Sequence, residues 1–198
     1  MPNSSLSVYQ TTIATMLRRL YPDVPVQEEW SSIFGQGLYS PRIDVAVGPF
    51  SIVHGVQLVE QYNELMFSSA QFIAQLSRYH LINMAVIGDD FQEEEFNNHI
   101  NGVMENLWHR NQNARCLIAI EIENEVSRKH LMGGAINAAA LGRIGIAVAW
   151  TDGKLRAFTN MKRYLDYLAS VHKNTFDTAN LVILSTDQLI QAIDQNIA

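Results

Sequence analysis

Two apolar runs that flank a helical segment constrain the fold of this chain most strongly. Residues 117–123 alternate isoleucine with other residues, and residues 144–150 are almost wholly apolar. The segment 128–141 between them has helical character, with Ser127 as its expected N-cap and Gly142 at its end. Strands covered on both faces are typical of parallel sheets, so this stretch predicts a right-handed β-α-β unit.

The rest of the chain carries the periodic patterns of amphipathic helices and short strands. Residues 81–87 fit a helix or a strand equally well, and Asp152-Gly153 predicts a hairpin from 144–150 to a strand at 154–159. The other predicted strands are 33–39, 42–47 and 181–184, and the predicted helices are 5–20, 56–79, 96–108, 161–171 and a last one capped by Ser185 and Gln188.

Length and element order predict a single α/β domain. A chain of 198 residues is within the usual size of one domain, and it has no internal repeat or low-complexity linker. The helical region 50–114 leaves two alternatives open. It is a helical layer covering the sheet, which we favour, or it is the surface of a homodimer.

Composition predicts a cytoplasmic protein. No run approaches the ~18 apolar residues of a membrane span, and the N-terminal residues lack the pattern of a secretory signal. The single cysteine, Cys116, cannot form an internal disulfide, which fits a reducing compartment. We expect Cys116 to be a buried apolar residue.

The charge distribution is uneven. The net charge of −6 argues against nonspecific affinity for nucleic acid, which comes mainly from Lys and Arg. Residues 1–114 carry 5 Lys and Arg against 12 Asp and Glu, whereas residues 115–198 carry 9 against 8. Charge alone favours a solvated acidic surface, but if a polyanion binds, the C-terminal half is the expected contact.

Three carboxylates lie on strands that otherwise suit a core. Glu121 and Glu123 share one face of the strand 117–123, about 7 Å apart, and Asp44 interrupts the apolar strand 42–47. Placing carboxylates there costs free energy, unless a cation or hydrogen bonds offset the repulsion between them and their desolvation. Oxygen ligands favour Mg²⁺, Mn²⁺ or Ca²⁺, so the three acids predict a divalent-metal site.

Two other observations bear on this metal hypothesis. Exposed strand ends often carry Glu, and a lone strand Asp can pair with an arginine such as Arg42 or Arg115. A zinc site is not expected, because the histidines are scattered without ligand spacing: they are His54, His80, His99, His109, His130 and His172.

The order of these elements resembles the PD-(D/E)XK nuclease superfamily. The matching pieces are helix 5–20, Pro41-Arg-Ile-Asp44, Glu121-Ile-Glu123, helix 127–142 and strand 144–150. The chain departs from the family pattern at Glu123, where a lysine is expected, and this is similar to the Glu-x-Glu variant of some type II restriction endonucleases. The resemblance covers the N-terminal helix and residues 33–150.

The resemblance implies a fold and an activity. The fold would be a restriction-endonuclease-like three-layer core, with a central mixed sheet flanked by helices and 50–114 as a helical insertion. The activity would be Mg²⁺- or Mn²⁺-dependent hydrolysis of phosphodiester bonds, with DNA as the expected substrate. Asp44 and Glu121 would bind metal, Glu123 would be a further ligand or general base, and Lys129 would replace the missing lysine.

Two other functions stay open. The missing motif lysine and the acidic charge are consistent with a nuclease-fold protein that binds nucleic acid, or serves in assembly, without catalysis. A metal-dependent hydrolase of small phosphates is the third hypothesis. Activity on model phosphoesters without activity on polynucleotides would distinguish it.

Overall fold

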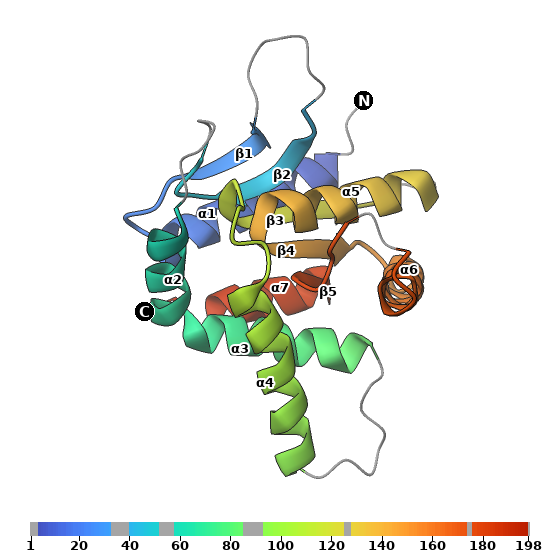
Figure 1. Ribbon diagram of the computed structural model, residues 1–198. Helices are drawn as coiled ribbons and strands as arrows, with labels where there is room; N and C mark the ends of the chain where they lie inside the picture. Colours follow the sequence, from blue (N-terminus) through green and yellow to red (C-terminus); the bar gives the residue numbers. More distant parts are fainter. Residues whose placement is uncertain are drawn as a thin grey trace.

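The computed structural model describes residues 4–32, 40–51, 58–84, 93–124, 128–173 and 176–197. Within these residues the chain is an α/β protein, in which an open mixed sheet of five strands packs against seven helices (Figure 1). The predicted α/β class with a central mixed sheet is therefore confirmed.

The described elements follow one another in an order close to the predicted one. None of the described helices is long and apolar enough to cross a membrane. The elements are α1 (Ser4–Leu20), β1 (Val26–Ser31), β2 (Arg42–Val47), α2 (Val59–Ser68), α3 (Ala70–Asn83), α4 (Glu93–His109), β3 (Cys116–Glu123), α5 (Arg128–Leu141), β4 (Gly142–Ala149), α6 (Asp152–Ser170), β5 (Leu181–Ser185) and α7 (Thr186–Asp194).

The strands lie in the sheet in chain order, from β1 to β5. The pairs β1–β2 and β2–β3 are antiparallel, whereas β3–β4 and β4–β5 are parallel. The predicted β-α-β unit is confirmed, because α5 connects the parallel strands β3 and β4. The carboxyl ends of β3 and β4 consequently lie at the same edge of the sheet.

Helices cover both faces of the sheet (Figure 1). On one face, β3 and β4 pack against α5 and α6 through small residues such as Ala135, Ala138 and Ala139. On the other face, buried side chains of α1, α2, α3, α4 and α7 form one continuous cluster with Ile118, Ile120 and Ile122 of β3. Cys116 is fully buried, as predicted.

The helix α3, which belongs to the region 50–114, covers the outer edge of the sheet. The backbone N–H of Ile183 in the edge strand β5 donates to His80 Nδ1 at 3.0 Å, and Asn83 Nδ2 donates to the Ile183 carbonyl at 2.9 Å. These bonds satisfy backbone groups that an edge strand would otherwise expose. The described part of 50–114 is thus a covering layer of the sheet, and a homodimer stays a prediction.

Three local predictions differ from the structure. The helix expected over 56–79 is divided at Ser69 into α2 and α3. The hairpin expected at Asp152-Gly153 is wrong, because the Thr151 side chain accepts the N–H of Lys154 at 3.3 Å and caps the long helix α6. The strand expected over 33–39 lies outside the described residues, and β1 precedes it.

Gly145 brings α5 close to β4, and this contact yields a stability prediction. A Cβ atom at Gly145 would lie 2.7 Å from the backbone nitrogen of Ala139 and 2.8 Å from the carbonyl carbon of Ala138. We expect Gly145→Ala to lower the free energy of unfolding by about 2 kcal/mol or more, because helix and strand must separate. Urea unfolding would measure this change.

The control is Gly102→Ala in α4, where an added Cβ would have no neighbour within 4 Å. Alanine favours a helix over glycine by up to about 1 kcal/mol, so this variant should be as stable as the unaltered protein or more stable. Equal stability of Gly145→Ala and the unaltered protein would contradict the close packing of α5 on β4.

Candidate functional site

The Asp44 side chain lies at the backbone between Glu121 and Glu123. The ladder between β2 and β3 runs from Val47↔Ile118 to Val45↔Ile120 and stops there. At the next position, Asp44 Oδ2 accepts the backbone N–H of Ile122 at 2.6 Å. The Asp44 side chain thus bonds to the β3 backbone just beyond the end of the β2–β3 ladder. This hydrogen bond holds the Asp44 carboxyl beside Glu121 and Glu123.

The backbone around Asp44 departs from a regular strand. Glu29, which would be the partner of Asp44 on β1, has a φ of 51°, and the register between these strands omits this pair. Beyond this break, Ile43 packs on the α5 side of the sheet, whereas Val45 packs on the α1 side. The two side chains would share one face of a regular strand, so the alternation of faces does not continue through the break.

Burial and neighbouring acids raise the pKa values of Glu121 and Asp44. Burial raises the pKa of Glu121 to about 9, and the charges of Asp44, Glu123 and Glu29 contribute in the same direction. Burial also raises the pKa of Asp44 to about 6, opposed by its hydrogen bond from Ile122 and reinforced by Glu29 and Glu123. Four carboxyl groups therefore interact at one end of β1, β2 and β3.

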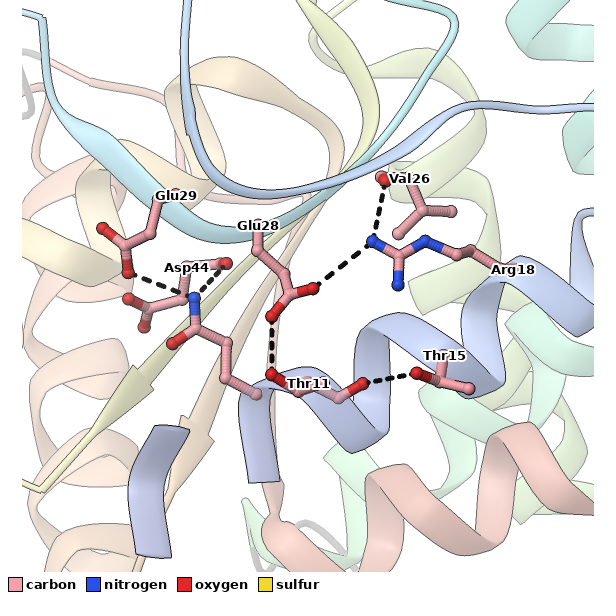
Figure 2. Close-up of polar contacts among 8 residues, drawn as sticks. Thr11, Thr15, Arg18, Val26, Glu28, Glu29 and Asp44 are labelled. Carbon is pink, nitrogen blue, oxygen red and sulfur yellow. Dashed lines mark hydrogen bonds and ion pairs between the residues drawn. The ribbon is translucent and has the colours of Figure 1, made fainter. Parts of the chain in front are cut away.

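Two residues whose sequence positions do not indicate a site join this cluster. Gln10 of α1 donates from Nε2 to the Asp44 carbonyl at 2.7 Å and to Glu29 Oε1 at 3.1 Å. Figure 2 shows Glu29 and Asp44 side by side on neighbouring strands, with the Glu29 carboxylate and the Asp44 carbonyl meeting the side chain from α1. A second connection runs from Glu28 to Thr11 and Arg18 of the same helix. These bonds fix α1 against the strands that carry Asp44.

The arginines that were alternative partners of Asp44 have other partners. Arg42 pairs with Glu29 at 3.4 Å, and both side chains are largely exposed. Arg115 donates from Nη1 to Ser51 Oγ at 3.4 Å. Among the described residues, Asp44 has no ion pair with an arginine. Ion pairing therefore does not explain why a carboxyl lies at this position.

The helix α5 passes directly over Glu121. A Cβ atom at Gly134 would lie 3.5 Å from Glu121 Oε2, an ordinary van der Waals distance, so this part of α5 packs on the Glu121 side chain. A Cβ atom at the neighbouring Gly133 would meet nothing within 4 Å. Lys129 belongs to the first turn of α5, and its side chain lies outside the described part of the structure.

The donor set fits a hard divalent cation by its chemistry. It consists of carboxylate oxygens that are partly buried beside one another, and a cation would offset their repulsion. Within the described residues, no three His, Cys, Asp or Glu side chains form a group arranged to hold a metal ion. One Asp44 oxygen bonds to Ile122 instead. The metal hypothesis therefore requires these carboxyl groups to rotate toward a common point.

Comparisons with models of protein families, with curated proteins and with solved structures found no match to this chain.

Proposed function

We propose that this chain is a Mg²⁺- or Mn²⁺-dependent nuclease of the PD-(D/E)XK type, with DNA as its substrate. Asp44, Glu121 and Glu123 are its metal-binding residues. The proposal rests most on one observation: the Asp44 carboxyl accepts the Ile122 backbone N–H, directly between the two glutamates, although 77 to 79 residues separate the acids in the chain.

The arrangement of elements supports this proposal. In a restriction-endonuclease-like core, a helix precedes an antiparallel strand pair that carries the metal-binding Asp, and a crossover helix follows the strand with the second acidic motif. Here α1, β2, β3, α5 and β4 follow one another in that order, with β2 antiparallel and β4 parallel to β3. The helices α2 to α4 then correspond to the insertion between β2 and β3.

In the proposed reaction each acid of the cluster has a role. A bound divalent cation would polarise the scissile phosphate and lower the pKa of the attacking water. Asp44 and Glu121 would hold the cation, and Glu123 would be a further ligand or accept a proton from the water. The raised pKa of Glu121 means that it must release a proton before it binds metal, so metal affinity should increase with pH.

The position usually occupied by lysine is the main departure from this family. Glu123 occupies it, and Lys129 in the first turn of α5 is our candidate for the missing positive charge. In that role it would interact with a phosphate oxygen near the metal. Arg128 and His130 flank it and are candidates for contacts with neighbouring phosphates.

Metal-dependent cleavage tests the proposal. We expect the full chain to cut plasmid or linear DNA in Mg²⁺ or Mn²⁺ and to leave it intact in EDTA. Gel electrophoresis of end-labelled DNA and RNA measures the products and the preferred polynucleotide. Absence of cleavage on every DNA and RNA substrate, with either metal, would contradict a nuclease.

A nuclease-fold binding module without catalysis is the second candidate. Two observations favour it: Glu123 replaces the motif lysine, and the described acids do not form a converged ligand group. This candidate predicts retained binding of nucleic acid without product in either metal. Cleavage that requires Glu121 would exclude it.

A further inference from the structure

The exposed side of α6 carries polar and aromatic residues in one stripe. Arg156, Asn160, Tyr164 and Tyr167 recur at spacings of three or four residues, so they lie on one face of the helix. All four are exposed, and the aromatic side chains of Tyr164 and Tyr167 keep 52% and 61% of their accessible surface. Exposed aromatic residues beside an arginine are chemically suited to a ligand with both flat rings and negative charge.

A groove of about 610 Å³ runs between this stripe and α5. Its apolar lining comes from side chains of both helices, and its polar lining comes from the α6 stripe. The apolar residues are Leu131, Met132 and Met161, and the polar and aromatic ones are Arg156, Asn160 and Tyr164. The groove therefore combines a cation, an amide and an aromatic ring over an apolar surface.

The two helices that form the groove are connected to the strand that carries Glu121 and Glu123. Leu131, in its wall, lies one helical turn before Gly134, the residue of α5 that faces Glu121. The other wall, α6, starts two residues after Trp150, whose backbone N–H donates to the Glu123 carbonyl at 3.3 Å. A ligand lying in the groove would consequently have one end near the proposed metal-binding carboxylates.

The charge of α6 favours an anionic ligand. The helix carries Lys154, Arg156, Lys162 and Arg163 against Asp152 and Asp166. Lys162 pairs with Asp166, and Arg163 donates to the Met84 carbonyl at 2.8 Å. Within the described part of the chain, Arg156 forms no ion pair. Its guanidinium is thus available to a phosphate, in contrast to the acidic N-terminal half.

We propose that this α5–α6 groove binds one unpaired strand of nucleic acid, and this inference rests on the proposed nuclease function. Arg156 contacts a backbone phosphate, and a base stacks on the ring of Tyr164. An unpaired strand fits these residues better than a duplex, because paired bases already stack on one another and leave no face for Tyr164. The groove leads that strand toward Glu121 and Glu123.

Binding measured without turnover tests the groove. Fluorescence anisotropy of a labelled oligothymidine would be recorded for the full chain in EDTA, where the proposed chemistry cannot proceed. We expect Tyr164→Ala to weaken binding about ten-fold, the scale of one lost stacked base. Arg156→Ala should weaken it by about the same factor, because it loses a hydrogen bond to a charged phosphate. Tyr164→Phe should bind like the unaltered protein, because it keeps the ring.

Two matched controls lie on other elements. Arg19→Ala removes an exposed arginine from α1, and Phe67→Ala removes a 79% exposed aromatic ring from α2. Both should bind the oligothymidine with unaltered affinity, and competition by a duplex should be weaker than competition by the single strand. Unaltered binding by Arg156→Ala and Tyr164→Ala, or stronger competition by the duplex, would contradict the proposal that the groove binds an unpaired strand.

The outcomes separate this inference from the proposed function. Metal-dependent cleavage together with unaltered binding by both groove variants would contradict binding in the groove and leave the nuclease proposal standing. Binding that requires Arg156 and Tyr164, without cleavage in any metal, would support binding in the groove and contradict the nuclease proposal. No binding of any polynucleotide by the unaltered protein would overturn both.

Discussion

Glu121→Gln is expected to lower the rate of metal-dependent DNA cleavage by about a thousand-fold or more, because it removes several kcal/mol of charge stabilisation from the reacting phosphate. Glutamine keeps the shape of the side chain under Gly134 but offers a neutral oxygen in place of a carboxylate. Metal affinity and the reaction that depends on it should therefore fall together.

The measurement is the rate of cleavage of a labelled DNA at saturating Mg²⁺, compared with Glu105→Gln. Glu105 is an exposed residue of α4, outside the acidic cluster, so its variant removes one carboxylate without touching the site. Thermal unfolding of both variants verifies that they fold. Cleavage by Glu121→Gln at the unaltered rate would remove Glu121 from the proposed chemistry.

The sequence was most informative where apolar residues were continuous. The strands β3 and β4 and the helix α5 agree with their predicted positions within two residues, because a parallel strand buried on both faces leaves few alternatives. The edge strand β1 was missed. Its sequence, Val26–Ser31, includes two consecutive glutamates and only two buried apolar residues, which is a weak strand pattern.

The errors elsewhere have local physical causes. Asp152-Gly153 occurs in hairpins and also at helix starts, and the deciding group is the Thr151 side chain that caps α6. The helix predicted over 56–79 has continuous apolar periodicity across Ser69, so periodicity alone could not reveal the break between α2 and α3. The side chains of β2 stop alternating regularly between the two faces of the sheet at Asp44, where the neighbouring Glu29 has a positive φ.

Part of the candidate site was accessible from the sequence and part was not. Asp44, Glu121 and Glu123 were conspicuous because carboxylates are costly on apolar strands. Glu29 and Gln10 were not conspicuous, because an exposed glutamate and a helical glutamine are ordinary on a protein surface. Only the packing of α1 against β1 and β2 brings Gln10 to the Asp44 carbonyl. The role of Lys129 stays a prediction.

The pH dependence of stability gives an independent test of the acidic cluster. In the folded, metal-free protein, burial raises the pKa of Glu121 from the ordinary value of 4.5 to about 9. Between these values the folded state keeps a proton that the unfolded chain has released, so the free energy of unfolding decreases as pH rises. The contribution of the protonated carboxyl is complete below about pH 4.5 and is lost as pH rises through about 9.

We therefore expect the unfolding temperature in EDTA to decrease from about pH 5 to about pH 9, by an amount that corresponds to a few kcal/mol. Asp44, with its pKa raised from 3.8 to about 6, adds to the decrease in the lower part of this range. Glu121→Gln should flatten the profile, because glutamine does not ionise. Glu105→Gln should keep the slope of the unaltered protein.

Metal should act in the opposite direction. Mn²⁺ binds the ionised carboxylates of the folded state, so it should raise the unfolding temperature more at pH 9 than at pH 5. The increase should be lost in Glu121→Gln and kept in Glu105→Gln. Differential scanning calorimetry with and without Mn²⁺ measures both effects without any substrate. An equal increase in both variants would mean that the cation binds elsewhere, whereas its loss in Glu121→Gln alone would locate binding at the carboxylates beside Asp44.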